Sequence, residues 1–463
     1  MTMQTALPLT EEIWSALGGP PAAPGRLAFV GAGSLPSAFA VSDLAAASVA
    51  AAGLALSELA ARTSRRAPQV AVDRRLASLW FGWSLTPRGW RLPPAWDDWS
   101  GDYRCADGWI RVHANAPAHR NAALRVLGQP TDRDEAARRV ARLDGDALET
   151  AIVEAGGCAA RMRRAGEWRA HPQGAAVAAE PLIAWDDWRA PARGHQAGEN
   201  WRPAPGRPLQ GLRVLDLTRV LAGPVATRFL AACGASVLRI DPPDWDEPAV
   251  VPEVTPGKSC ARMDLRLPGD HARFMELLRD ADVLVHGYRP GALEGLGLGA
   301  ETRRALNPGL VEASLDAWGW TGPWQGRRGF DSLVQMSAGI AAAGMAWKGA
   351  DTPTPLPVQA LDHATGWVMA AAVLRGLVRR LDGGGHVARL SLARTAALLM
   401  AAGPSGDAGW RPAVAADYAP EEEATDWGPA LRLRQPLSVA EVRLQWASPA
   451  RRLGSDAPRW PAG

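Results

Sequence analysis

The alternation of strand-like and helix-like segments that begins at residue 212 constrains the fold more than any other feature of this sequence. Residues 212–217 (LRVLDL) form a short apolar run rich in branched side chains, which predicts a buried strand. Residues 222–234 have the apolar spacing of a helix and close on a glycine, and residues 236–240 predict the next strand. Two strands joined by a helix in so short a span imply a right-handed parallel crossover.

The same alternation continues towards the C-terminus. Helices are expected at 272–282 and from 362 to about 380, and strands at 283–287, 310–315 and 383–392. This order is typical of an α/β fold with a doubly wound, Rossmann-like parallel sheet.

Composition indicates how the rest of the chain is divided. The stretch 82–201 is rich in Trp, Arg and Pro, and its strand pattern at 107–115 with helix patterns at 120–128 and 146–157 predicts a smaller α+β domain. The predicted organisation is therefore a partial copy of the large domain at 1–81, a small α+β domain at 82–201, a linker at 202–211, an α/β domain at 212–402 and an irregular tail at 403–463.

The partial copy is inferred from an internal similarity. Residues 39–72 and 359–390 each contain an aspartate, an alanine-rich helix pattern, a basic turn and a strand pattern with a Val-Ala pair. The two aspartates, Asp43 and Asp362, stand 319 positions apart, and the Val-Ala pairs stand 317 apart. We interpret this as an internal duplication. A chance similarity between two alanine-rich helices is the alternative.

Charge and cysteine content exclude several classes of protein. The 463 residues carry a net charge of +3 with acids and arginines interleaved, so neither a nucleic-acid nor a membrane footprint is expected. The four cysteines are far apart, which argues against a structural metal site or a disulfide framework. The alanine-rich stretch 37–61 contains Asp43 and Glu58 and is expected to be a buried helix, and the N-terminus lacks a secretory pattern. A cytoplasmic location follows.

Two carboxylates, Asp331 and Asp362, each stand at the start of a predicted helix. An acid in the first turn is stabilised as an anion by free N–H groups and the helix dipole, so both residues could be simple helix caps. The surrounding sequence favours a chemical role.

The region from Pro208 to Leu399 resembles the class III CoA transferases, the formyl-CoA and carnitine-CoA transferase family. The segments that carry the resemblance, in family order, are PLQGLRVLDLTRVLAGPVATRFLAACGASVLRID, VHGYRPGALEGLGL, ASLDAWGWTGPW, GFDSLVQMSAG, PVQALDHATGWVMAAAVLRGL and HVARLSLARTAALL. YRCADGWIRVHA and EAGGCAARMRRAGEWRAHPQG are similar to the family's smaller domain. That domain precedes the large one here, whereas in the family it follows.

The resemblance implies a CoA transferase that moves CoA between carboxylic acids through an aspartyl-CoA thioester on Asp362, with Asp331 positioning substrate. Backbone N–H groups at the helix start near Ala360 and Gly366 are expected to bind the developing oxyanion. The residues it assigns to coenzyme A are Val220, Leu221, Ala222, Asp241, Lys258, Met263, Tyr288, Arg289 and Leu296. No permanently bound cofactor is expected, because coenzyme A is a substrate. The partners implied are acyl-CoA, a small carboxylic acid and a second copy of the chain in a homodimer.

Three alternatives stay open. Leu221 and Gly295 replace a usual polar and a frequent basic residue of the family, which fits a catalytically inactive CoA-binding or partner subunit. Acyl-CoA racemases of this fold need a histidine before the aspartate at 331, where this chain has Phe330, so that chemistry is disfavoured. Asp43 is either a second nucleophile or a relic of the duplication.

Overall fold

A seven-stranded sheet organises the computed structural model, which describes residues 6–64, 66–188, 201–383, 385–404 and 409–461. The strand order is β10-β9-β8-β11-β12-β13-β7, and every pair is parallel except β13 with β7. The strands are β8 (Arg213–Leu217), β9 (Ser236–Asp241), β10 (Lys258–Arg262), β11 (Val283–His286), β12 (Val311–Asp316), β13 (Gly385–Ser391) and β7 (Ala184–Trp188). The predicted α/β class with a mainly parallel sheet is confirmed.

Side-chain alternation along the strands builds two cores. In β8, Val214 belongs to the larger core and Leu215 to a second cluster on the opposite face, because successive side chains point to opposite sides of a sheet. The helices packed against the second face are α11 (Pro268–Arg279) and α12 (Ala300–Leu306). The larger core contains α9 (Ala222–Ala232), α15 (Ala360–Leu381) and α16 (Leu392–Ala401).

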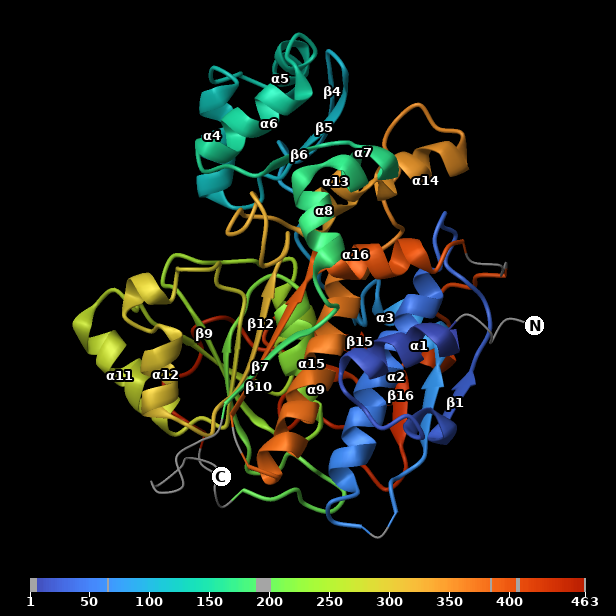
Figure 1. Ribbon diagram of the computed structural model, residues 1–463, viewed down its shortest axis with the longest axis vertical. Coiled ribbons are helices and arrows are strands. Elements are labelled where there is room, and N and C mark those ends of the chain that lie inside the picture. Colours follow the sequence, from blue (N-terminus) through green and yellow to red (C-terminus); the bar gives the residue numbers. More distant parts are fainter. Residues whose placement is uncertain (1–5, 65, 189–200, 384, 405–408, 462–463) are drawn as a thin grey trace.

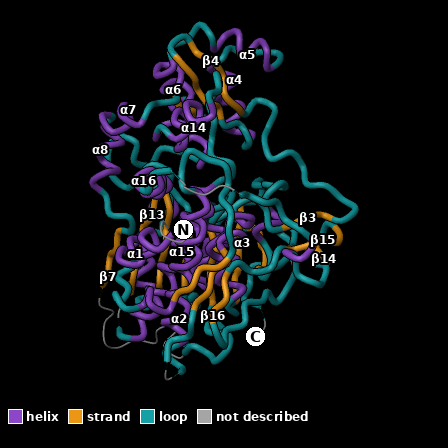
Figure 2. Tube along the Cα trace, turned by 90° about the vertical axis from the view of Figure 1, so that its right-hand side faces the viewer, coloured by secondary structure: helices purple, strands orange, loops and turns teal. Residues whose placement is uncertain are grey.

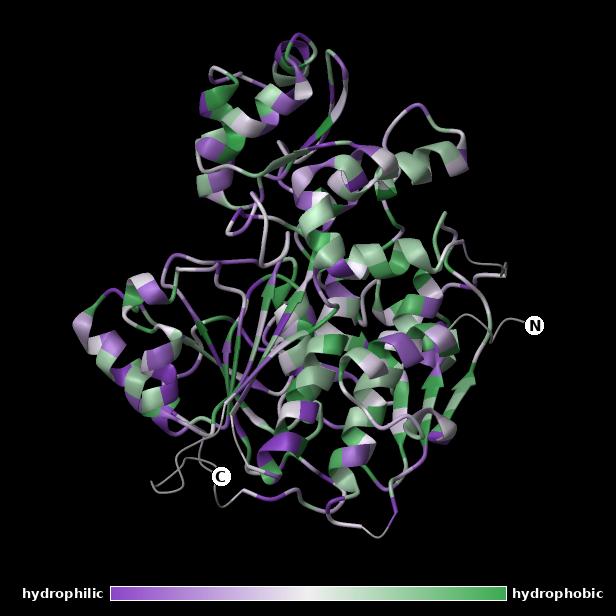
Figure 3. Ribbon diagram, in the orientation of Figure 1, coloured by the Kyte–Doolittle hydropathy of each residue, from purple (hydrophilic) through white to green (hydrophobic). Residues whose placement is uncertain are grey.

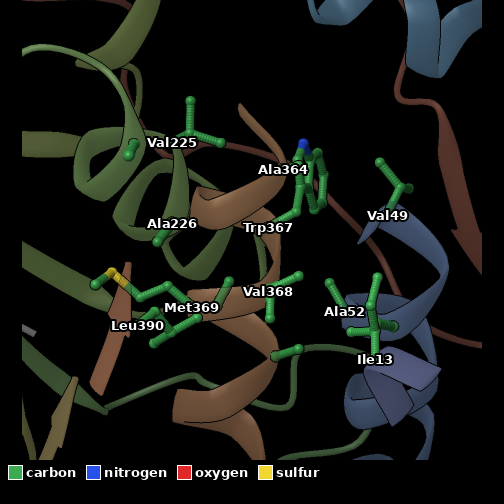
Figure 4. Packing of buried hydrophobic residues seen from close by; sticks show 14 of the residues in the cluster. Ile13, Val49, Ala52, Val225, Ala226, Ala364, Trp367, Val368, Met369 and Leu390 are labelled. Carbon is green, nitrogen blue, oxygen red and sulfur yellow. The ribbon is translucent and has the colours of Figure 1, made fainter. Parts of the chain in front are cut away.

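The two alanine-rich helices predicted from the sequence pack along each other. These are α2 (Val41–Ala60) and α15, and Figure 1 shows them side by side. In Figure 4, Trp367 and Val368 of α15 face Val49 and Ala52 of α2 across the core. α2 is long and apolar enough to span a membrane by composition, but 94% of its apolar window is buried inside the protein. Figure 3 shows this central pair as mostly hydrophobic, whereas α11 and α12 alternate between hydrophobic and hydrophilic residues.

The two helices begin with the same backbone geometry. The residues before them, Ala40 and Gln359, have φ/ψ of −74°/56° and −75°/65°. The first N–H group of each helix donates to the carbonyl two residues back, at 2.8 Å in both cases. Each helix is followed by a strand with a parallel neighbour, since β1 (Leu27–Val30) pairs with β2 (Val70–Asp73) as β12 pairs with β13. This agreement supports the predicted duplication.

A separate three-stranded antiparallel sheet lies at the top of the molecule in Figure 1. It consists of β4 (Gly101–Cys105), β5 (Gly108–Val112) and β6 (Ala159–Arg161), packed on α4 (Pro117–Val126), α5 (Arg133–Val140) and α6 (Gly145–Glu154). α7 (Ala165–Ala170) and α8 (Pro172–Ala179) connect it to the region of α13 (Asp331–Ala338), α14 (Ile340–Lys348) and α16. The stretch 189–200 of the predicted small domain lies outside the described residues.

The tail that was expected to be irregular contains three short strands. β16 (Leu437–Val439) pairs with β2, and β15 (Gly428–Arg432) pairs with β3 (Leu85–Pro87) and with β14 (Glu423–Thr425). Figure 2 shows the β14-β15-β3 sheet at one side of the molecule. Strands of three to five residues are too short for alternation to identify them in a sequence. The remaining helices of four residues or more are α1 (Ala6–Ala16), α3 (Arg74–Trp80) and α10 (Val251–Val254), and the 3-10 turn at Ala23–Arg26.

Candidate active site

A cavity opens at the carboxyl ends of the parallel strands, where the strand order reverses between β8 and β11. Ligands of open α/β sheets bind at such a switch point. Loops after β8, β11 and β12 line this strand-tip cavity, whose volume is about 380 Å³. Its lining includes Arg219, Val220, Leu221, Ala222, Trp245, Tyr288, Arg289, Asp316, Arg327, Arg328 and Asp362.

A second cavity adjoins it. This aromatic cavity has a volume of about 690 Å³ and is lined by Phe81, Trp83, Trp96, Trp245 and Phe330, among others. Asp362 lines both cavities and is half-buried. In the part of the chain that the structure describes, no donor is hydrogen-bonded to the carboxylate oxygens of Asp362. The side chain therefore stands free at the wall shared by two cavities.

Asp331 lies beside Asp362 and caps its helix. One oxygen of Asp331 accepts the N–H groups of Leu361 and Asp362, at 2.9 and 3.0 Å, and the other accepts the side-chain amide of Gln335. Burial raises the pKa of Asp331 to about 6 despite these donors. Burial, and next the neighbouring Asp331 carboxylate, raise the pKa of Asp362 well above its usual value. The structure thus brings the two predicted carboxylates together.

The expected oxyanion donors are occupied. At the start of α15 the N–H group of Ala360 donates to Val358 O, those of Leu361 and Asp362 to Asp331, and that of His363 to Gln359 O. The expectation that these groups would face a reacting carbonyl is wrong for this arrangement, because Asp331 and two backbone carbonyls already accept them. The amino end of α9, which begins at Ala222 on the strand-tip cavity, offers the nearest alternative.

Five of the residues assigned to coenzyme A line the strand-tip cavity: Val220, Leu221, Ala222, Tyr288 and Arg289. Val220 has φ of 63°, an uncommon conformation for a β-branched residue and a mark of a constrained site. Its N–H group donates to Glu247 at 2.8 Å, and the Trp245 indole donates to the same oxygen at 3.0 Å. Glu247 thus fixes the turn that forms the cavity wall.

The other four assigned residues do not line either cavity. Lys258 is buried, and its ammonium donates to Asp216 at 2.9 Å and to Thr227 and Pro224 O. Asp241 is likewise buried and paired with Arg239 at 2.8 Å. Lys258 is therefore not placed to bind coenzyme A as expected, since its charge is already neutralised inside the sheet. Met263 and Leu296 lie in or against the apolar cluster that packs on α11.

Several lining residues were missed by sequence reasoning. Arg219 stacks on Trp245 and Tyr288, with 4.8 and 5.6 Å between guanidinium carbon and ring centroid. Burial, then the charges of Arg328 and Arg289, lower the pKa of His119 to about 4. Arg219 directly precedes Val220, which was assigned to coenzyme A, and Arg327 and Arg328 lie shortly before Asp331. Their proximity in the sequence to these expected site residues was the only signal available.

Asp43, the counterpart of Asp362, is placed differently. Its carboxylate is buried and accepts a hydrogen bond from Nε of Arg74 at 2.9 Å, and neither the strand-tip nor the aromatic cavity includes it. A carboxylate fixed in a buried ion pair is not available as a nucleophile. This placement favours the relic interpretation.

Comparison with known proteins decides the family of the region that holds this site. Residues 209–423 match the family described as CoA-transferase family III. This part of the chain is similar to CoA-transferase family III. The match to the family contains Asp331, Asp362 and the loops after β8, β11 and β12, whereas the N-terminal helices and the β4-β5-β6 sheet lie outside it.

Individual proteins that are similar to this region have names of the same kind. A probable fatty acyl-CoA transferase of Mycobacterium tuberculosis is 35% identical over 190 residues, covering 38% of this chain and 48% of the relative. A succinyl-CoA:glutarate CoA-transferase of Mus musculus is 33% identical over 215 residues, covering 42% and 48%. A crystal structure of the M. tuberculosis protein Rv3272 has a TM-score of 0.40 at 33% identity, covering 43% of this chain and 58% of that one. The chain thus spans about half the length of these relatives.

Proposed function

We propose that the protein is an acyl-CoA transferase in which Asp362 is the nucleophile. The observation that carries the proposal is the position of the Asp362 carboxylate, free of hydrogen-bond donors on the wall between the strand-tip and aromatic cavities. A nucleophile in this place can reach a thioester whose CoA part occupies one cavity and whose acyl part occupies the other. The similarity of residues 209–423 to CoA-transferase family III and the activities in the names of the relatives support the same reaction.

Coenzyme A is proposed to occupy the strand-tip cavity. Arg219, Arg289 and Arg328 line it, and the charges of Arg328 and Arg289 add to burial in lowering the pKa of His119. Guanidinium groups gathered in this way suit the phosphates of a CoA substrate. The sheet is accordingly proposed to work as a Rossmann-like nucleotide site, with the ligand at the switch point.

Transfer proceeds by exchange of acyl partners on one carboxylate. The Asp362 carboxylate attacks the thioester carbonyl of the donor, the C–S bond breaks, and a mixed anhydride and CoA thiolate form. The thiolate then attacks the aspartyl carbonyl, which gives an aspartyl-CoA thioester and releases the donor acid. An acceptor carboxylate attacks this thioester, and the returning thiolate takes the acceptor's acyl group and regenerates Asp362. Each step exchanges one activated acyl bond for another, so the reaction needs no additional source of free energy.

Asp331 is proposed as a positioning residue in this cycle. By accepting the N–H groups of Leu361 and Asp362 it fixes the first turn of α15. Together with burial, its carboxylate also raises the pKa of Asp362, so it opposes ionisation of the proposed nucleophile.

The test is a screen of acyl-CoA donors against carboxylic acid acceptors with the full chain, with the products separated by chromatography. The proposal expects at least one pair to exchange CoA and Asp362→Ala to lose the activity. CoA binding without exchange for any pair would instead identify a binding subunit. The proposal also includes a homodimer, on the resemblance to the family, and analytical ultracentrifugation decides that part separately.

A further inference from the structure

The distribution of charge in the aromatic cavity goes beyond what the proposed reaction requires. Six carboxylates line this cavity, but among the described residues that line it there is no lysine or arginine. The carboxylates are those of Asp97, Asp98, Asp246, Glu247, Asp331 and Asp362. An anionic group that entered this space beyond the reacting carboxyl would therefore meet no cation.

Two guanidinium groups next to the cavity stack on its aromatic rings. Arg111 stacks on Trp96, with 4.7 Å between its guanidinium carbon and the ring centroid, and donates to Asp102 at 2.8 Å. Arg219 stacks on Trp245 at 4.8 Å and lines the strand-tip cavity instead. Neither guanidinium lines the aromatic cavity, although each contacts a ring that does. The rings of Trp96 and Trp245, and not the guanidinium groups of Arg111 and Arg219, therefore form the wall of the aromatic cavity.

Glu247, Asp97 and Asp331 already accept hydrogen bonds from protein groups, so they do not require a cationic ligand. Glu247 accepts from Arg239, Asp97 accepts from Arg120 at 3.0 Å, and Asp331 accepts two backbone N–H groups and Gln335. Asp98 and Asp246 are solvent-exposed. Asp362, which has no hydrogen-bond donor among the described residues, is the carboxylate that meets the reacting carboxyl group of the acid. A cationic tail deeper in the cavity would thus lose its hydration and find, among the described lining residues, unpaired carboxylates only at the exposed Asp98 and Asp246.

The polar groups that remain inside the lining are neutral. Ser332 Oγ, His113 Nδ1 and both ring nitrogens of His363 are buried and without a hydrogen-bond partner in the described part of the chain. Burial lowers the pKa of both His113 and His363 to about 3, so each imidazole is uncharged at neutral pH. The His113 ring also lies stacked on Phe330, with centroids 3.7 Å apart.

We infer that the aromatic cavity holds the tail of a monocarboxylic acid, and that this tail is bulky, apolar and uncharged. The inference rests on the proposed CoA transfer and specifies its substrate class. Cavities of about 300–1,000 Å³ accommodate ligands of this size, and this one is about 690 Å³. A dicarboxylic acid would bury its second carboxylate among acids and rings, and an acid with a quaternary ammonium tail would bury an unpaired cation.

Three acceptor acids of matched shape test this directly: 5,5-dimethylhexanoate with a neutral tail, 4-trimethylammoniobutanoate with a cationic tail, and adipate with an anionic tail. The full chain is assayed with each acid and one common acyl-CoA donor. The expected result is a kcat/KM for the neutral acid on the order of 100-fold above that for either charged acid. Equal values for all three, or a preference for a charged tail, would overturn the inference.

The variant Trp96→Ala tests whether this cavity makes the selection. Trp96 is 37% exposed, so its replacement is expected to leave the protein folded and to uncover Arg111. We expect the neutral-to-adipate ratio to fall by about tenfold or more, because apolar wall is lost and a guanidinium becomes reachable. Trp347→Ala, a 54% exposed residue outside both cavities, is the matched control and should keep the ratio. An unchanged ratio in Trp96→Ala would contradict the assignment.

Failure of the proposed function is distinguishable from failure of this inference. If no acid accepts CoA, transfer is absent, and calorimetric titration of the same three acids into the full chain still measures their binding. Tighter binding of the neutral acid, weakened by Trp96→Ala, then supports the assignment of the cavity. Tighter binding of adipate or of the cationic acid refutes it.

Discussion

Asp331 holds the first turn of the helix that carries Asp362: its carboxylate accepts the N–H groups of Leu361 and Asp362 itself, at 2.9 and 3.0 Å. The same contact brings two carboxylates together in a buried place, and the pKa of both groups is raised. One residue thus both orders the proposed nucleophile and opposes its ionisation.

Replacing Asp331 by Asn is expected to move the acidic limb of the kcat/KM profile to lower pH. The substitution removes the like charge that raises the pKa of Asp362 while keeping an oxygen that can accept the two N–H groups. Asp331→Ala would leave those N–H groups and Gln335 without a partner and cost about 1–3 kcal/mol of unfolding free energy. Initial rates between pH 5 and 9 measure the shift, and a limb that stays in place would show that Asp331 does not tune its neighbour.

Asp362→Asn is expected to raise stability relative to the wild type, and more so as pH rises. The pKa of Asp362 in the folded protein lies well above its usual value, so the fold binds the proton more tightly than the unfolded chain does. The resulting stabilisation is fully present below the unfolded pKa of about 3.9 and is lost as pH rises through the folded pKa. Asn does not ionise, so the variant does not lose unfolding free energy in this way as pH rises. Urea unfolding at pH 5 and pH 8 gives the comparison, and a stability difference that shrinks at pH 8 would refute the raised pKa.

Gly366→Ala is expected to reduce activity strongly, because α15 approaches α9 through this glycine. A Cβ at 366 would lie 2.3 Å from the carbonyl oxygen of Ala222 and 3.0 Å from Val225 Cβ, one turn after Asp362. Gly376→Ala is the matched control at the far end of the same helix, where the new Cβ would lie 2.7 Å from Val311. Both should lower the melting temperature, by overpacking costs of about 1–3 kcal/mol. Only Gly366→Ala should lower kcat/KM by about tenfold or more, and equal losses in activity would contradict the assignment of the site.

Asp43→Asn is expected to weaken the fold without affecting transfer. Asp43 neutralises the guanidinium of Arg74 in a buried ion pair at 2.9 Å, and breaking such a pair costs about 3–5 kcal/mol. Specific activity per folded molecule, measured below the unfolding transition, should equal that of the wild type. Loss of acyl transfer in a folded Asp43→Asn protein would make the second aspartate a functional residue.

The main sheet could be predicted because its strands and helices each have a clear hydrophobic period. The strand expected at 236–240 is β9 (Ser236–Asp241), and the helix expected from 362 is α15 (Ala360–Leu381). β10 (Lys258–Arg262) was missed because its sequence, KSCAR, has two basic ends and no apolar run. β7 (Ala184–Trp188), with two aspartates in five residues, escaped for the same reason.

The site was predictable only for the residues that lie in segments resembling the family, such as Asp331 and Asp362. Asp331 and Asp362, which are 31 positions apart, meet because α13 and α15 both begin at the same place. The partners of Lys258 could not be read from the sequence, since Asp216 and Thr227 are brought to it by the sheet. The aromatic cavity draws on segments from Phe81 to His363, so its composition emerges only when the chain is folded.

The most direct test of the account is to look for the aspartyl thioester itself. The full chain is incubated with an acyl-CoA donor, treated with hydroxylamine, digested and analysed by mass spectrometry. The account predicts a hydroxamate on Asp362, absent in Asp362→Ala and absent from Asp43. A protein that exchanges CoA between acids with no modification at Asp362, or with the modification on another carboxylate, would contradict it.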